Sequence, residues 1–143
     1  MRVFFDASII IAALLSKTGG SSQLFKFIKA GIITGITSQT VIEEILEEDK
    51  PKKLKKSKEE IVNFITRSQL IIRKPITLEE IEPYQNLIDV EDTHLVAGAN
   101  LTKCTHLVSL DKKHVINPNV QKKFLPLRIV SPKELIEEIV SDR

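Results

Sequence analysis

The hydrophobic positions of this chain fall into two alternating patterns. Short runs of mostly apolar residues, with little polar alternation, are typical of strands that are buried on both faces. Between these runs, apolar residues recur at intervals of three and four, as they do on one face of a helix. The predicted strands lie at residues 2–5, 32–37, 70–72, 105–110 and 127–130.

Five strands that alternate with helices predict an α/β fold. The expected architecture is a three-layer α/β/α sandwich with a mostly parallel five-stranded sheet, whose crossovers are right-handed. The length of 143 residues corresponds to a single domain over residues 1–143, and the sequence contains no internal repeat or linker.

Start signals for helices recur along the chain. Ser38 is a good N-cap for a helix over 39–48, and three capping boxes place a glutamate three residues after a serine or threonine. The polar segment 112–124 and the lysine-rich segment 50–58 are predicted to be loops. The other expected helices begin at Ala7, Ser21 or Ser22, Ser57, Thr77, Asp89 and Ser131.

The composition excludes several classes of protein. Cys104 is the one cysteine, so an internal disulfide is excluded, and the lack of a CxxC pair argues against a structural zinc cluster. The longest apolar run, residues 9–15, is far shorter than the ~20 residues of a membrane span. Asp6 interrupts what would be the apolar part of a signal peptide. We therefore expect a soluble, cytoplasmic protein without a membrane partner.

Charge adds one feature. The net charge of +2 by itself predicts no partner, but six lysines fall within residues 50–58. Such a run is either a solvated loop or a patch that faces phosphates, because clustered lysines attract polyanions by releasing their counterions.

Acidic residues follow the predicted strands. Asp6 comes directly after the first strand, Asp111 just after the fourth, and Glu43 and Glu44 lie one turn into the helix after the second. In open α/β sheets, ligands bind outside the carboxyl ends of the strands. Each acid also has a plain structural role, as an N-cap for Asp6 and as solvent-facing helix residues for the glutamates. Adjacent glutamates point about 100° apart, so only one of them faces this edge.

Asp89 and Asp92 extend this acidic set. They lie three residues apart at the start of an Ala-rich helix, where they share a face and repel each other unless a cation or proton intervenes. Several converging carboxylates form an oxygen-rich site suited to Mg²⁺ or Mn²⁺. These ions activate water and offset the charge that develops on a phosphodiester during in-line attack.

The acidic segments, in this order, resemble the PIN-domain family. The resemblance rests on Val3-Phe4-Phe5-Asp6-Ala7-Ser8, on Ser38 through Glu44-Ile45, on Asp89-Val90-Glu91-Asp92, and on Val108-Ser109-Leu110-Asp111-Lys112. It covers essentially the whole chain. It implies a metal-dependent ribonuclease, commonly the toxin of a VapC-like toxin–antitoxin pair and often a homodimer. RNA would be the substrate and an antitoxin protein the partner.

Positions that match the family motif suggest roles for individual residues. Asp6 is the first acid, supported by a hydrogen bond from Ser8; Glu44, rather than Glu43, is the second. Asp92 is the third, with Asp89 as an accessory metal ligand, and Asp111 is the fourth. Ser109 matches a small hydroxyl residue near the last strand end, or makes only a local backbone hydrogen bond. The candidate nucleic-acid rim consists of Lys52, Lys53, Lys55, Lys56 and Lys112.

One departure from the family keeps other functions open. Many members carry a further acid two residues after the last one, where this chain has Lys113. A catalytically inactive RNA- or protein-binding module on the same fold is therefore the alternative to an endoribonuclease. An aspartyl-phosphate phosphatase is disfavoured because Ser8 stands where that chemistry usually has a second Asp.

The histidines lack mutual metal-ligand spacing: His94 and His106 are expected at a helix surface and a strand end, whereas His114 is a candidate phosphate contact.

Overall fold

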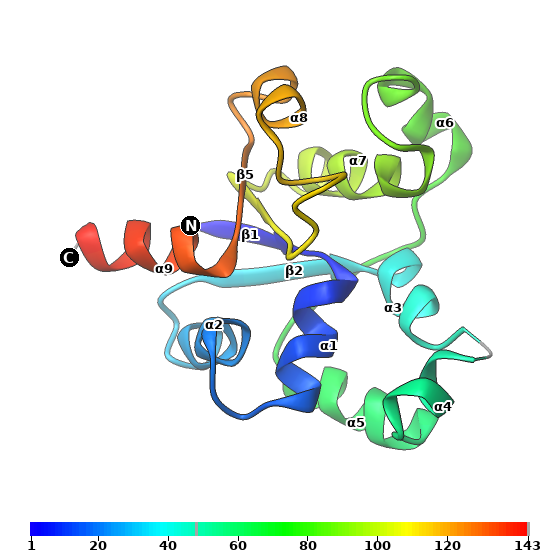
Figure 1. The fold of residues 1–143 in the computed structure, drawn as a ribbon, viewed down its shortest axis with the longest axis vertical. Helices are drawn as coiled ribbons and strands as arrows, with labels where there is room; N and C mark the ends of the chain where they lie inside the picture. Colours follow the sequence, from blue (N-terminus) through cyan, green and yellow to red (C-terminus); the bar gives the residue numbers. More distant parts are fainter. Residues whose placement is uncertain (48, 143) are drawn as a thin grey trace.

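The computed structural model describes residues 1–47 and 49–142. Its centre is a sheet of five strands in the order β3-β2-β1-β4-β5, and every neighbouring pair is parallel. The three-layer α/β/α prediction is therefore confirmed (Figure 1). The strands are β1 (Arg2–Phe5), β2 (Thr34–Ser38), β3 (Ile71–Arg73), β4 (His106–Val108) and β5 (Arg128–Val130).

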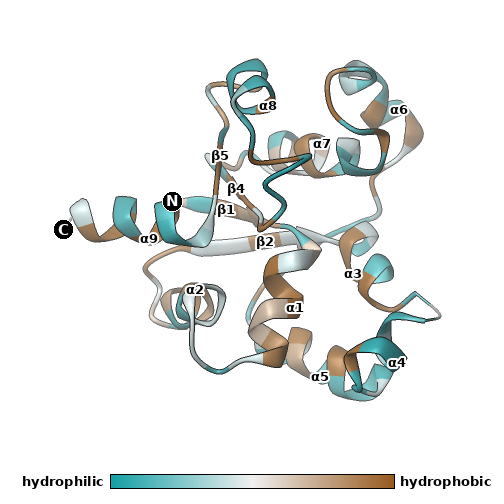
Figure 2. Cartoon of the chain, viewed as in Figure 1, coloured by the Kyte–Doolittle hydropathy of each residue, from teal (hydrophilic) through white to brown (hydrophobic). Residues whose placement is uncertain are grey.

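Helices cover both faces of the sheet. The helices α1 (Ala7–Leu15) and α2 (Gly20–Lys29) lie on one face, and α7 (Thr93–Leu101) packs on the other against β1, β2 and β4 (Figure 1). Phe4 and Phe5 in the central strand are fully buried between these layers. Figure 2 shows mostly hydrophobic colours along α1 and hydrophilic colours over much of the short helices α4 (Lys50–Leu54) and α8 (Pro118–Lys123).

The predicted helix starts are largely correct. The three capping boxes form as expected, because each serine or threonine side chain accepts a hydrogen bond from the glutamate three residues later. Within the described residues, the helices are too short and too polar to span a membrane. The remaining elements are α3 (Gln39–Ile45), α5 (Lys58–Arg67), α6 (Leu78–Ile81), α9 (Pro132–Ser141) and the 3₁₀ turns η1 (Glu82–Tyr84) and η2 (Val90–Asp92).

Two segments predicted as loops contain short helices. Helix α8 (Pro118–Lys123) begins at a real start signal, because Asn117 accepts a hydrogen bond from the Val120 N–H and Pro118 holds the first position. Helix α4 (Lys50–Leu54) ends where Lys55 adopts a left-handed conformation. Both helices are too short to show a periodic apolar stripe. The helix predicted over 39–48 ends at Ile45, and Glu48 lies outside the described residues.

The strand order determines where a site can form. The chain passes from β1 to β2 and β3 on one side, and then crosses to β4 and β5 on the other. The strand order therefore reverses beside β1, and the crevice outside the carboxyl ends of β1 and β4 is where ligands bind in such sheets. Phe5 pairs with Val108 in the register of these strands, so Asp6 and Ser109 follow at the same level.

Close packing explains the glycine in α7. A Cβ atom added at Gly98 would lie 2.6 Å from Cζ of Phe4, whose ring is fully buried. The absence of a side chain at this position lets α7 lie directly on β1. The small residues of this helix therefore serve contact with the sheet, as the sequence indicated.

We expect Gly98→Ala to lower the free energy of unfolding by up to about 2 kcal/mol, because overpacking costs about 1–3 kcal/mol and the gain in helix propensity returns about 1 kcal/mol. Urea unfolding of Gly98→Ala, Phe4→Leu and the double variant checks this. The double variant should be more stable than the sum of the single effects predicts, because the shorter leucine makes room for the added methyl group. Strict additivity would contradict the proposed contact.

Candidate active site

Asp6 lies at the centre of the acidic site. It stands between β1 and α1, and its side chain makes no capping hydrogen bond to the helix. Instead, the hydroxyls of Ser109 and Ser8 both donate to Oδ2 of Asp6, over 2.7 and 3.1 Å. Ser8 therefore contacts the acid that the family motif assigns to it. Ser109 combines both roles considered from the sequence, because its Oγ also accepts from the Asp111 N–H, over 3.0 Å.

Burial dominates the electrostatics of Asp6. Only 8% of the residue is exposed. Removal from water raises the pKa of Asp6 above its ordinary value, although the hydrogen bonds from Ser109 and Ser8 act in the opposite direction; the charge of Glu44 raises this pKa further. The protein therefore holds a carboxylate in a place where its negative charge is unfavourable.

A tight turn after β4 orients Asp111. Its Oδ1 accepts hydrogen bonds from the backbone N–H groups of Lys113 and His114, over 3.0 and 2.9 Å. Its Oδ2 faces Nδ1 of His114 at 3.3 Å. Partial burial raises the pKa of Asp111, but the hydrogen bonds from His114 and Lys113 outweigh this and the net pKa is lowered. Asp111 is therefore held as an ionised carboxylate.

Asp92 lies close to acids that precede and follow it in the chain. It ends the turn η2 and stands immediately before α7. Burial raises the pKa of Asp92 to about 6, and the negative charges of Asp6, Asp111 and Asp89 add to this effect. Asp89 caps η2 by accepting a hydrogen bond from the Glu91 N–H. The fold thus brings Asp6, Asp92 and Asp111 into one region, although they are far apart in the sequence.

Glu44 joins this region through a histidine that the sequence placed wrongly. Oε1 of Glu44 lies 2.5 Å from Nε2 of His94, whereas Glu43 is exposed. His94 is 6% exposed and not at a helix surface, because α7 is covered by the sheet on one side and by α6 and η1 elsewhere. Within the described residues, its Nδ1 is buried without a hydrogen-bond partner. Nothing in the spacing of the sequence signals this contact.

Positive charge lies beside the acids. Lys50, at the start of α4, lines a hollow of about 370 Å³ together with Glu44, Asp92, Glu47 and Glu91. This lysine was not among the rim residues selected from the sequence. Of those selected, Lys56 pairs with Glu60 at 3.8 Å, and the others, which are exposed, are Lys52, Lys53, Lys55 and Lys112.

The donors gathered here suit a divalent cation. One ligand atom each of Asp92, Asp111 and His114 lies within 4.8 Å of the other two, and Asp6 is near enough to raise the pKa of Asp92. Carboxylate oxygens are preferred ligands of Mg²⁺ and Mn²⁺, and Mn²⁺ also accepts imidazole. A cation at this place would relieve the repulsion that the raised pKa of Asp92 reveals. The residues present therefore fit the metal ion that the resemblance implies.

His106 lies outside this site. It begins β4, at the opposite end of the strand from Ser109 and Asp111, which agrees with the expected strand-end position. It is nevertheless buried, and its Nε2 contacts Glu138 of α9 at 2.6 Å; Glu138 also pairs with Arg128. This group therefore joins α9 to the edge of the sheet, away from the acids.

The fold and the acidic site agree with a family model. The chain belongs to the PIN-domain family, whose model, described as "PIN domain", matches residues 2–113. PIN domains are generally nucleases and typically bind a divalent metal ion. The matched range includes Asp6, Glu44, Asp89, Asp92 and Asp111.

A solved structure shares the fold. It is described as the crystal structure of VapBC2 from Rickettsia felis bound to a DNA fragment from their promoter. The matched chain is 17% identical, the match covers 92% of this chain and 98% of that chain, and the TM-score is 0.63. At this identity the likeness shows the fold alone. No curated protein sequence matches the chain.

The raised pKa of Asp92 predicts a pH-dependent effect of Asp92→Asn. The pKa of Asp92 is about 6 in the folded protein and has its lower, ordinary value in the unfolded chain. As pH rises between these two values, the unfolded chain loses the proton first, and the free energy of unfolding falls. Asparagine never ionises. In the metal-free protein, Asp92→Asn should therefore stabilise the fold more at about pH 7.5 than at about pH 4.

Urea unfolding in the presence of a chelator measures this difference. The matched control is Glu79→Gln, which neutralises an exposed carboxylate of α6. Its effect should be similar at both pH values. An Asp92→Asn effect that is equally large at both would show that the pKa of Asp92 is not raised in the folded protein.

Proposed function

We propose that this protein is a metal-dependent endoribonuclease that hydrolyses RNA phosphodiester bonds. The observation that carries the proposal is the convergence of Asp6, Asp92 and Asp111, with Glu44 beside them, at the carboxyl edge of the sheet. Family membership supports nuclease chemistry. RNA as the substrate and Mg²⁺ or Mn²⁺ as the ion follow from the resemblance and from the oxygen-rich donor set.

The acids share the task of holding the cation in this proposal. Asp6, Asp92 and Asp111 would hold the cation, with Glu44 and Asp89 as further carboxylates around it. The bound ion would supply activation of water and compensation of the charge that develops on the phosphodiester. Ser8 and Ser109 fix Oδ2 of Asp6, so this carboxylate keeps one orientation. The turn after β4 does the same for Asp111.

Lysines beside the acids would bind the substrate. Lys50 lies in the hollow next to Glu44 and Asp92, and the exposed lysines of α4 continue from it along the surface. Such a row offsets the charge of the RNA backbone close to a site that is itself negative. We propose that these lysines contact phosphates on one side of the scissile bond.

Replacement of Asp6 by Asn tests the proposed chemistry. We expect Mn²⁺- or Mg²⁺-dependent cleavage of labelled single-stranded RNA to fall at least about 100-fold, or ~2.7 kcal/mol in activation free energy. The fold should persist, because asparagine has nearly the same shape and needs no desolvation of a charge. Circular dichroism and urea unfolding check the fold.

Asp142→Asn, which neutralises an exposed carboxylate after α9, is the matched control and should leave cleavage unchanged. Full activity of Asp6→Asn would refute the assignment of the site. Wild-type protein that binds RNA but cleaves none with either ion would instead support the inactive binding module.

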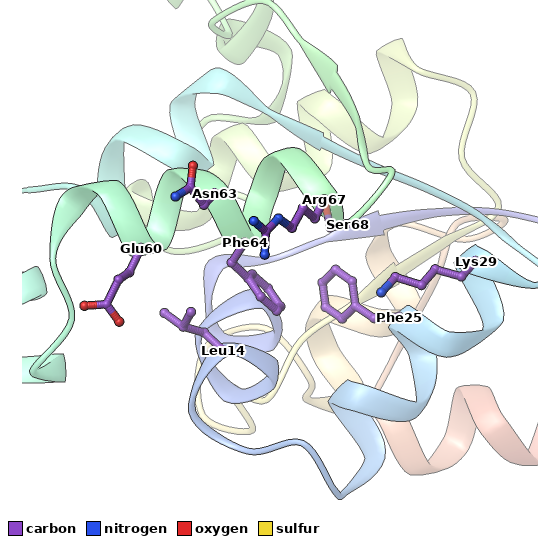
Figure 3. A pocket seen from close by; sticks show the side chains of 8 residues that line it. All are labelled: Leu14, Phe25, Lys29, Glu60, Asn63, Phe64, Arg67 and Ser68. Carbon is purple, nitrogen blue, oxygen red and sulfur yellow. The ribbon is translucent and has the colours of Figure 1, made fainter.

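An apolar groove offers a separate surface for the antitoxin. It lies between α1, α2 and α5, has a volume of about 390 Å³, and is lined by Leu14, Phe25 and Phe64 (Figure 3). The two phenylalanine rings meet edge to face with centroids 5.5 Å apart. Leu14 is eight positions beyond Asp6, or about 12 Å along a helix axis. The groove is therefore distinct from the acidic site.

Charge at the groove indicates what would bind there. Lys29 and Arg67 line it beside the phenylalanine rings, together with the acidic Glu60 (Figure 3). Glu60 pairs with Lys56 at 3.8 Å, which leaves Lys29 and Arg67 as the cations that face an incoming acid. We propose that it takes an amphipathic segment of an antitoxin, with apolar residues on the rings and an acidic residue toward the two cations. The solved VapBC2 structure motivates this class of partner.

Arg67→Glu should weaken this association at least about tenfold, or ~1.4 kcal/mol, because a like charge would then face the acidic residue. The binding partner for the test is a small DNA-binding protein encoded beside this gene, and calorimetry measures its affinity. Val62→Ala, on the exposed part of α5, is the control and should have no effect. Unchanged binding by Arg67→Glu would exclude the groove. Absence of such a partner would remove the toxin–antitoxin proposal but leave the nuclease proposal intact.

The assembly and location of the protein stay predictions. A homodimer follows from the family resemblance, and a cytoplasmic location follows from the composition. Gel filtration of the purified chain with light scattering measures the former directly.

A further inference from the structure

His114 is the one nitrogen donor in the group of candidate metal ligands found among residues 1–47 and 49–142. One of its ring nitrogens lies within 4.8 Å of a carboxylate oxygen of Asp92 and of Asp111. The family motif does not assign this position. The sequence suggested a phosphate contact for His114, whereas the structure turns its ring toward the carboxylates.

Local hydrogen bonds place the ring. The N–H groups of Lys113 and His114 both donate to Oδ1 of Asp111, and those of Val115 and Ile116 donate to its carbonyl oxygen. Val115 is fully buried and anchors the turn in the core. Nδ1 of His114 then faces Oδ2 of Asp111, the oxygen that these backbone groups do not contact.

The same turn explains the departure at Lys113. Its backbone N–H helps to hold Asp111, but the residue itself is exposed and carries the wrong charge for a metal ligand. The next residue, His114, brings a ring nitrogen close to carboxylate oxygens of Asp111 and Asp92. The loss of one oxygen ligand is thus matched by the presence of one imidazole.

We propose that His114 is a nitrogen ligand of the divalent cation held by Asp92 and Asp111, and that it makes the site prefer Mn²⁺ over Mg²⁺. The proposal rests on the metal dependence proposed above and specifies which ion serves it. Imidazole suits first-row transition ions, whereas Mg²⁺ strongly favours oxygen ligands and retains its waters.

The competing role of His114 is purely local. As a residue three positions after Asp111, it forms an ion pair or hydrogen bond with that carboxylate and touches no metal ion. In that case its removal changes the orientation of Asp111 but not the choice of ion. A spectroscopic measurement of the bound ion separates the two roles.

Pulsed electron paramagnetic resonance of the 143-residue chain with substoichiometric Mn²⁺ provides this test. A directly bound imidazole produces nitrogen modulation of the Mn²⁺ signal. We expect this modulation in the wild-type protein and its loss in His114→Gln. It should persist in Lys112→Gln, an exposed neighbour in the same turn, and in His94→Gln, which alters the other histidine near the acids. Since 44% of the His114 side chain is exposed, the fold should be unaffected, as circular dichroism can verify.

Calorimetric titration gives a second, independent readout. The ratio of Mn²⁺ to Mg²⁺ affinity should fall at least about tenfold in His114→Gln, which corresponds to ~1.4 kcal/mol. Bound Mn²⁺ without nitrogen modulation in the wild type, or modulation that survives His114→Gln, overturns the proposal. Metal-dependent RNA cleavage in the same samples would then show that the nuclease proposal stands without it. Failure of Mn²⁺ to bind at all would overturn the His114 proposal, and failure of both Mn²⁺ and Mg²⁺ to bind would overturn the nuclease proposal as well.

Discussion

The burial of several carboxylates close to one another is the constraint on which the site of this protein depends. Burial and the charges of Asp6, Asp111 and Asp89 raise the pKa of Asp92 to about 6. Asp6 is also buried, and its pKa is likewise raised. Such an arrangement costs folding free energy in the absence of a cation. Strongly perturbed acids gathered at one place are characteristic of functional sites.

Hydrogen bonds from neutral groups hold the acids in this unfavourable arrangement. Hydroxyls support Asp6 and backbone N–H groups support Asp111, and neither kind of donor cancels a negative charge. The acidic cluster therefore keeps its attraction for a cation while its geometry is fixed. Elsewhere the chain pairs its charges differently, as in the contact between Arg73 and Glu80, which holds the pKa of this glutamate at about 2. The contrast separates residues that stabilise the fold from residues that the fold keeps ready for a ligand.

Two histidines and one lysine make contacts that the sequence pattern could not predict. His94 lies in a helix whose residues 93–99 are all buried, so no periodic stripe distinguishes the side toward Glu44 from the side toward the sheet. His114 follows Asp111 in a turn whose shape depends on backbone hydrogen bonds that no residue type announces. The sequence did not distinguish Lys50 from the other lysines of residues 50–58, but in the structure α4 places it beside Asp92. Each of these positions depends on how one element packs against another.

The sequence by itself determined the layers, the strands, three capping boxes and the succession of acids after strand ends. These features are local or periodic, because a capping box spans four residues and a buried strand is a short apolar run. The resemblance assigned Glu44 rather than Glu43 to the site. Only the tertiary structure decided that Glu44 contacts His94, that His114 faces Asp92 and Asp111, and that Lys50 lies beside them. The physical reason is that strand order, register and helix packing convert positions far apart in the chain into neighbours, and none of these three is encoded within a single segment.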